Sequence, residues 1–176
     1  MKPGSALARD GAVVDEDFTE DAYHRIVAAL EDLGYRWYET ANFARPGRES
    51  LHNSAYWGAA DYLGVGIGAV STVGGTRWKN APDLAGYMTA IGAGRTPRRT
   101  TEHLDAATRR RERWMLAVRQ DAPISLSWAG DPDHPEAIGD LVSGGFIRRV
   151  DDDHLELTRE GRFVQNSVLG VLMDFD

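Results

Sequence analysis

Apolar residues recur every three or four positions in several stretches of the chain, which is the spacing of one buried face of an α-helix. The first stretch, residues 15–33, begins with three acidic residues and is followed by Gly34. This is expected of a helix, because its N-terminal dipole favours negative charge and a glycine often follows its end. The same spacing or helix-forming composition predicts further helices over 52–57, 82–94 with Pro82 at its first position, 104–119, 136–142 and 158–172.

Short runs rich in aromatic and β-branched residues lie between these helices and indicate strands. Residues 35–40 and 62–73 are such runs, and glycines interrupt the second one. Residues 41–51 have the composition of a loop. A Gly-Gly pair at 74–75 predicts a tight hairpin turn, and a second small hairpin is predicted around the three aspartates at 151–153.

The order of these elements divides the chain into two predicted domains. Residues 1–94 alternate helix and strand, which is typical of α/β folds. Residues 95–176 predict helix, helix, hairpin and helix, the order of a small, mostly helical, winged-helix-like domain. The polar run at 95–101 contains a proline and is typical of a linker, so we place the domain boundary between the two parts there.

The charge balance and the hydropathy argue against several classes of protein. The 176 residues include 20 basic and 27 acidic side chains, and the formal net charge of −7 gives a nucleic acid or an anionic membrane no overall attraction. No apolar run approaches the roughly 20 residues of a membrane-spanning helix. No apolar segment follows the N-terminal residues as in a secretory signal. We therefore expect a cytoplasmic protein with no nucleic-acid partner and no integral membrane segment.

Cysteine is absent from the sequence. Its absence excludes disulfides, thiolate zinc sites, a cysteine nucleophile and any iron–sulfur cluster held by cysteines of this chain. His24, His103, His134 and His154 have no partner at metal-ligand spacing, so we expect them on the surface.

One long block of the sequence resembles a known family. Residues 38–57 read Tyr-Glu-Thr-Ala-Asn-Phe-Ala-Arg-Pro-Gly-Arg-Glu-Ser-Leu-His-Asn-Ser-Ala-Tyr-Trp, and residues 61–71 read Asp-Tyr-Leu-Gly-Val-Gly-Ile-Gly-Ala-Val-Ser. These motifs closely resemble the radical SAM oxygen-independent coproporphyrinogen III oxidase-like family, in particular its haem-chaperone branch. The resemblance covers nearly the whole chain. It implies an α/β fold with the C-terminal units of an incomplete TIM-like radical SAM barrel over 1–94, followed by the small C-terminal domain over 95–176.

The resemblance also implies what this chain lacks. Full-length family members hold a [4Fe–4S] cluster on a Cys-x-x-x-Cys-x-x-Cys motif and use it to cleave S-adenosylmethionine, whereas this chain has no cysteine. We therefore expect the cluster and S-adenosylmethionine only in a full-length parent, and no catalysis by this chain alone. The chain resembles a C-terminal part, a split gene product or a relic.

In the haem-chaperone branch, the motif His-Asn-x-x-Tyr is the proposed haem-binding element, and here it falls on His52, Asn53 and Tyr56. A neutral imidazole is a common axial ligand of haem iron, and a tyrosine four residues later lies on the same helical face. His52 is therefore the candidate ligand of haem iron. The alternative is that His52 and Asn53 hold a loop by hydrogen bonds while Tyr56 and Trp57 pack inside.

The glycine-rich turn at 64–68 also has two interpretations. Its glycines have neither the spacing nor the following lysine of a nucleotide-binding loop, so a phosphate site is weakly supported. The resemblance places Ile67, Ala69 and Val70 near the adenosine part of S-adenosylmethionine, although the family usually has histidine where this chain has Val70. The alternative is a turn that needs glycine for close backbone approach.

Two groups of charged residues also have two interpretations each. The run from Arg109 to Arg113 is either a basic patch for a partner or for haem propionates, or a solvated helix face. Glu39 ends a predicted strand, where polar residues of barrels are often functional, and is otherwise expected to pair with Arg36 or Arg45.

The sequence thus supports two hypotheses on function. The first is a haem- or porphyrin-binding portion of a coproporphyrinogen III oxidase-like protein or haem chaperone. The second is a non-catalytic interaction domain or truncated relic that pairs with a separate cluster-bearing chain. A partial barrel leaves a sheet edge and helix faces uncovered, so we expect self-association or pairing with a cysteine-bearing N-terminal half.

Overall fold

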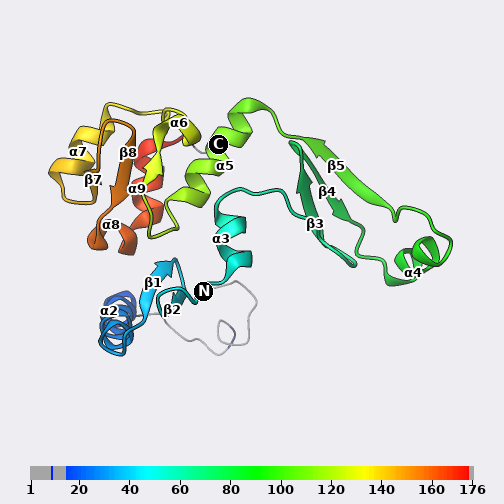
Figure 1. Ribbon diagram of the computed structural model, residues 1–176, viewed down its shortest axis with the longest axis horizontal. Coiled ribbons are helices and arrows are strands. Elements are labelled where there is room, and N and C mark those ends of the chain that lie inside the picture. The colour runs from blue at the N-terminus through cyan, green and yellow to red at the C-terminus, as the bar shows by residue number, and fades with distance from the viewer. Residues whose placement is uncertain (1–8, 10–14, 175–176) are drawn as a thin grey trace. The chain divides into compact units, whose positions relative to one another are not determined.

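The computed structural model of the chain describes Arg9 and residues 15–174 (Figure 1). It contains two compact units, one ending at Glu49 and the other beginning at Ser50. The expectation that no secretory signal is present falls on N-terminal residues outside the described ones. None of the described helices has the length and apolar character needed to cross a membrane.

The first unit is built from one amphipathic helix and one short hairpin. Helix α2 (Glu16–Asp32) begins where the Asp15 carboxylate accepts a hydrogen bond of 2.9 Å from a first-turn amide, as the sequence predicted. Strand β1 (Arg36–Glu39) follows and pairs antiparallel with β2 (Asn42–Ala44). The loop predicted over 41–51 is therefore wrong at β2, because pairing with β1 outweighs the loop-like composition of these residues.

Aromatic packing holds α2 against this hairpin. The buried Trp37 ring lies edge-on to Tyr23, with 5.7 Å between centroids, and stacks on Phe43 at 6.2 Å. The Tyr23 hydroxyl donates a hydrogen bond of 2.6 Å to the Thr40 carbonyl. Val27 on α2 is completely buried. The first unit thus has a small core of its own.

The second unit begins with helix α3 (Leu51–Trp57) and an antiparallel sheet. The sheet has the order β3-β4-β5, with β3 at Val70–Val73, β4 at Thr76–Asn80 and β5 at Arg99–His103. Figure 1 shows the three strands side by side, with α4 (Leu84–Gly92) in the connection from β4 to β5. The predicted Gly-Gly hairpin turn is confirmed, since β3 and β4 pair on either side of it.

Two predicted boundaries in this region are wrong. The strand predicted over 62–73 is regular only at its end, in β3, because Gly66 lies at φ 105° and interrupts the extended backbone. The helix predicted to start at Pro82 begins only after Asp83. The Asp83 carboxylate accepts a hydrogen bond of 3.1 Å from a first-turn amide and so caps α4.

Strand β5 lies where the sequence predicted a linker. The polar run at 95–101 extends into this strand, and Arg99 lies opposite Asn80 of β4. Consecutive threonines in the run favour an extended conformation, which the linker interpretation overlooked. The sheet therefore crosses the predicted boundary, and the division into domains 1–94 and 95–176 stays a prediction.

The rest of the second unit has the winged-helix order of elements. These elements are α5 (Ala106–Ala117), β6 (Ile124–Ser125), α6 (Leu126–Ala129), α7 (Ala137–Ser143), β7 (Ile147–Arg149), β8 (His154–Leu157), α8 (Arg159–Phe163) and α9 (Gln165–Leu172). Strand β8 lies between β6 and β7 and is antiparallel to both, so the predicted second hairpin is confirmed. The prediction of a single final helix is wrong. The backbone at Val164, with φ −112° and ψ 26°, separates α8 from α9.

One hydrophobic core fills this winged-helix-like part. Trp114 is completely buried, and its indole N–H donates a hydrogen bond of 3.0 Å to the Gly130 carbonyl. Helices and strands are mixed along the described chain, which confirms the predicted α/β class. The three sheets of the described residues are open, and their strand pairs are antiparallel, so these residues form no closed barrel.

Candidate functional site

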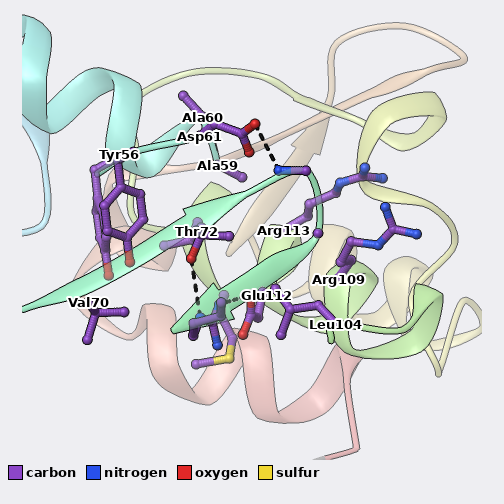
Figure 2. A pocket seen from close by; sticks show the side chains of 16 residues that line it. Tyr56, Ala59, Ala60, Asp61, Val70, Thr72, Leu104, Arg109, Glu112 and Arg113 are labelled. Atoms are coloured by element: carbon purple, nitrogen blue, oxygen red, sulfur yellow. Dashed lines mark hydrogen bonds and ion pairs between the residues drawn. The ribbon is translucent and has the colours of Figure 1, made fainter. Parts of the chain in front are cut away.

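A cavity of about 820 Å³ lies in the second unit. Its walls come from the end of α3, residues 59–62, the β3–β4 hairpin and α5. Figure 2 shows the Tyr56 ring at one end of this lining and the side chains of Arg109 and Arg113 towards the other. The volume is within the range of pockets that hold cofactors and other small ligands.

Helix α3 is fixed at both ends by polar contacts. At its start, the Ser50 hydroxyl accepts a hydrogen bond of 3.3 Å from the Asn53 amide. At its end, the Gln120 side-chain amide donates a hydrogen bond of 3.1 Å to the Trp57 carbonyl. Because Gln120 closely follows α5, this contact ties together the two helices that line the cavity.

The three predicted haem-binding residues lie on α3, and one of them reaches the cavity. Tyr56 lines the cavity, is 43% exposed, and has its ring 5.8 Å from that of Tyr62. His52 lies one helical turn earlier, exposed and outside the lining. Asn53 is half-buried, and its backbone amide serves the helix cap.

Residues 59–62 form a turn whose conformation the sequence did not predict. Ala59 has φ 54°, in the left-handed region that residues other than glycine rarely adopt. The Asp61 carboxylate accepts a hydrogen bond of 3.0 Å from the hairpin turn, and Tyr62 exchanges backbone hydrogen bonds of 2.9 and 3.0 Å with Thr72. These contacts attach the turn to β3 and place Asp61 and Tyr62 in the cavity wall. The left-handed conformation of an alanine leaves no signal in the sequence.

The glycine-rich segment contributes one of the residues predicted to lie near S-adenosylmethionine. Val70 lines the cavity, whereas Ile67 lies outside the lining and is 44% exposed. The Ala69 carbonyl accepts a hydrogen bond of 2.9 Å from the Asn80 amide and so belongs to the sheet. The structure therefore does not bring these three residues to one surface of the cavity.

Two glycine amides of this segment, those of Gly64 and Gly66, have partners within the protein. The Gly64 amide donates to the Ser71 hydroxyl at 2.9 Å, and the Gly66 amide donates to the Tyr87 hydroxyl at 3.1 Å. A Cβ atom at Gly64 would lie 2.1 Å from the Val70 carbonyl oxygen, so glycine permits a close approach of two backbones here. These contacts favour the structural interpretation of the glycines over a phosphate site.

An ion pair beside the cavity joins the sheet to α5. Arg77 Nη2 on β4 lies 2.6 Å from Glu112 Oε2, and each side chain is 28% exposed. The hydrogen bond to Glu112 raises the pKa of the Arg77 guanidinium. Arg77 also lies 3.4 Å from Glu102 on β5, so one arginine connects three elements.

The arginine run on α5 is divided between two environments. Arg110 forms an ion pair with Asp133, away from the cavity lining. Arg109 and Arg113 are four residues apart and both line the cavity. The sequence predicted one patch or one solvated face for the whole run, whereas the packing of α5 beside the hairpin separates Arg109 and Arg113 from Arg110.

Glu39 in the first unit is buried, but not in the predicted ion pair. Its side chain is 1% exposed and accepts a hydrogen bond from the Asn42 side-chain amide. Arg36 is paired with Glu49 at 3.9 Å, and Arg45 lies over an aromatic ring. The expected pairing with Arg36 or Arg45 is therefore wrong for the described residues. The unpredicted hairpin brings Asn42 to Glu39 in its place.

Comparison with known proteins found sequence relatives that are named heme chaperones and a solved structure of similar fold. No protein-family model matches it. The chain is 32% identical to the heme chaperone HemW of Mycobacterium tuberculosis over 180 residues, which cover 98% of this chain and 45% of that protein. It is 29% identical to HemW of Bacillus subtilis over 160 residues, which cover 87% of this chain and 42% of that protein. Its fold matches that of the Escherichia coli radical SAM enzyme HemN, a coproporphyrinogen III oxidase, with a TM-score of 0.67, 18% identity, and coverage of 93% of this chain and 42% of that chain.

The chain corresponds to the C-terminal part of HemW/HemN-like proteins. The resemblance seen in the sequence motifs is thereby confirmed. This HemW-like chain spans less than half the length of the relatives it matches. The likeness to HemN is a likeness of fold, and it confirms the predicted relation to the radical SAM fold.

The residues of this HemW-like chain do not fit the iron–sulfur cluster that radical SAM relatives imply. The sequence has no cysteine, and the described residues include no group of three or more histidine or carboxylate side chains that could hold a metal ion. His134 is engaged by Glu136 at 3.2 Å and by Asp174 at 2.9 Å. Cysteine ligands for such a cluster would have to come from outside this chain.

Proposed function

We propose that this HemW-like chain binds haem or a related porphyrin at the cavity beside α3, with His52 as a ligand of the iron and Tyr56 as a contact in the cavity wall. The observation that carries the proposal is the position of Tyr56, which lies one turn from the exposed His52 and lines an 820 Å³ cavity. The similarity to haem chaperones over 98% of the chain supports the same ligand class.

The side chains at this site suit a large planar ligand. His52 is exposed, so its imidazole is accessible to an iron atom. The rings of Tyr56 and Tyr62, 5.8 Å apart, provide aromatic surface beside it. Asn53 on the same helix is half-buried and is the third residue of the proposed binding motif. The chain thus supplies ligand and wall residues without any cluster of its own.

The proposal for S-adenosylmethionine concerns a longer HemW-like protein. In such a protein, the cofactor would meet the cluster held outside this chain, and Ile67, Ala69 and Val70 are the residues proposed near it. Val70 lines the cavity, and the other two do not. A location in the cytoplasm and the absence of a nucleic-acid partner also stay predictions.

Titration with ferric haem, followed through the Soret band, tests haem binding by the purified chain. We expect a saturable, red-shifted band in the unaltered chain, loss of that band in His52→Ala, and a weakened or altered band in Tyr56→Phe. His24→Ala is the matched control, because His24 lies on α2 and pairs with Glu20 at 3.7 Å. A band that is absent, or that is unchanged by both α3 substitutions, would contradict the proposal.

Helix α4 favours a second function, as an interaction surface. None of its residues is buried, and Leu84, Met88 and Ile91 are exposed on one stripe at 63%, 62% and 52%. We propose that this stripe supports self-association of the chain; in a longer protein, a cysteine-bearing N-terminal part is the alternative partner.

Light scattering across a concentration series tests the α4 surface. We expect the mass of the unaltered chain to rise with concentration, and Leu84→Glu combined with Met88→Glu to remove that rise. Val142→Glu on α7 alters a residue that is 38% exposed and is the control. A chain that remains monomeric over the series would contradict self-association.

A further inference from the structure

We infer that the cavity recognises its ligand through carboxylate groups, and that Arg109 and Arg113 on α5 are the residues that bind them. The inference rests on the proposed porphyrin-binding function and assigns the acidic edge of the ligand to a helix outside the haem-binding motif. The ligand class it specifies is a porphyrin with free carboxylates, in preference to an uncharged porphyrin of the same shape.

The two arginines face the cavity together. They are four residues apart on α5, which places them one above the other on a single face of the helix. Both line the cavity, on the side away from Tyr56 in Figure 2. Different elements thus present an aromatic wall and a pair of cations to one open cavity.

Neither arginine is neutralised by a carboxylate of the described residues. Arg109 makes a long contact of 3.4 Å from Nε to the Asp105 carbonyl. Arg113 donates a hydrogen bond of 2.8 Å to the Trp128 carbonyl and lies over the Trp128 ring. These partners are neutral groups, so both positive charges remain available to an anion.

The other basic residues nearby are already engaged. Arg77 is paired with Glu112 at 2.6 Å, and Arg110 is paired with Asp133. Asp61 also lines the cavity and keeps its charge while it accepts a hydrogen bond from the hairpin turn. The lining thus includes three arginines, Arg77, Arg109 and Arg113, against two carboxylates, Asp61 and Glu112. The cavity wall therefore carries more positive than negative charge, in a chain whose net charge is −7.

Most of the remaining wall is apolar or aromatic. Tyr56 and Tyr62 come from α3 and the turn after it. Leu104 lies just before α5, and Met115 and Leu116 lie on it. Such a wall favours a ligand with an apolar body, while two guanidinium groups favour a ligand with carboxylates at one edge. A small polar anion would leave the apolar wall unused, and an uncharged porphyrin would leave the arginines without partners.

Binding of metal-free protoporphyrin IX and of its dimethyl ester, measured by fluorescence, tests the inference without involving the iron ligand. We expect the free acid to bind the unaltered chain about tenfold or more tightly than the ester, as for charged hydrogen bonds. Arg109→Gln combined with Arg113→Gln should remove that preference and leave ester binding nearly unchanged. Arg149→Gln, on the exposed end of β7, is the control for loss of one positive charge. Circular dichroism of each variant verifies that it is folded.

The outcomes separate this inference from the proposed haem ligation. Equal binding of acid and ester by the unaltered chain, or a preference that survives the double substitution, would overturn the arginine assignment even if His52 ligates iron. An arginine-dependent preference for the acid would support it even if His52→Ala leaves the haem spectrum unchanged. A chain that binds neither porphyrin overturns the inference.

Discussion

Arg77 on β4 and Glu112 on α5 lie 2.6 Å apart and connect the antiparallel sheet to the first helix of the winged-helix-like part. Both side chains line the cavity, and each is 28% exposed. The pair is therefore partly shielded from water, and it fixes the sheet relative to the helix that carries Arg109 and Arg113.

A double-mutant cycle on this pair measures its contribution to stability. Arg77→Met and Glu112→Gln, alone and together, should give a coupling free energy of about 1 kcal/mol in urea unfolding, because partial burial reduces screening. The pair Arg148–Glu156 is the control, at the same 2.6 Å but with the arginine 61% exposed. We expect a smaller coupling there, and equal coupling in both pairs would contradict the role assigned to burial.

The left-handed alanine in the cavity wall gives a second prediction. Ala59 has φ 54°, which costs an L-residue on the order of 1 kcal/mol and costs glycine nearly nothing. Ala59→Gly relieves this strain but also adds freedom to the unfolded chain, so we expect it to raise the free energy of unfolding by a few tenths to about 1 kcal/mol. Ala60→Gly, at the next position, should lower it by a few tenths to about 1 kcal/mol because it only adds freedom to the unfolded chain. Destabilisation by both substitutions would show that Ala59 carries no strain.

Gly64 gives a third prediction, on backbone packing. A Cβ atom there would lie 2.1 Å from the Val70 carbonyl oxygen, so Gly64→Ala should lower the free energy of unfolding by about 1–3 kcal/mol. Gly139→Ala in α7 is the matched control, since no atom lies within 4 Å of its added Cβ. The control should be stabilising by roughly 0.5–1 kcal/mol, because alanine is the better helix former. Chemical denaturation of both variants makes the comparison, and a neutral Gly64→Ala would exclude the close approach.

His134 gives a prediction on pH. Hydrogen bonds to Asp174 first, and to Glu136, raise the pKa of His134 above its ordinary value of 6.5. A raised pKa in the folded state means that protonation favours folding, so this contribution is complete below about pH 6.5 and is lost as the pH rises through the higher folded pKa. Unfolding measured across that window should show falling stability in the unaltered chain. The fall should be smaller in His134→Gln, and an identical pH profile in the two would contradict the assignment.

The sequence was sufficient for elements whose signals are local. The acidic start of α2, the Gly-Gly turn between β3 and β4, and the aspartates between β7 and β8 each depend on neighbouring residues, and the structure has these elements where they were predicted. The family resemblance was also readable, because its motifs are contiguous. The sequence was insufficient where pairing across the chain decides the outcome, as in β2, whose composition is that of a loop. In β5, pairing with β4 outweighs the polar, proline-containing run before it, although the consecutive threonines favour a strand.

The cavity could be predicted only in part for the same reason. Tyr56 was identified through its motif. Asp61 and Tyr62 reach the cavity wall through a turn with a left-handed alanine, a conformation that the residue types do not predict. Arg109 and Arg113 were identified only as members of a basic run. The packing of α5 beside the hairpin is what distinguishes them from Arg110. Contacts between distant segments determine which arginines have no carboxylate partner.

Amide hydrogen exchange of the purified chain, with and without ferric haem, tests the central claim that the ligand occupies the cavity beside α3. The proposed site predicts slower exchange on haem addition in residues 51–62 and in the cavity-facing part of α5, and little change in α7 and β7. In His52→Ala, the protection of α3 should weaken. Protection confined to other elements, or no protection at saturating haem, would contradict the proposed site.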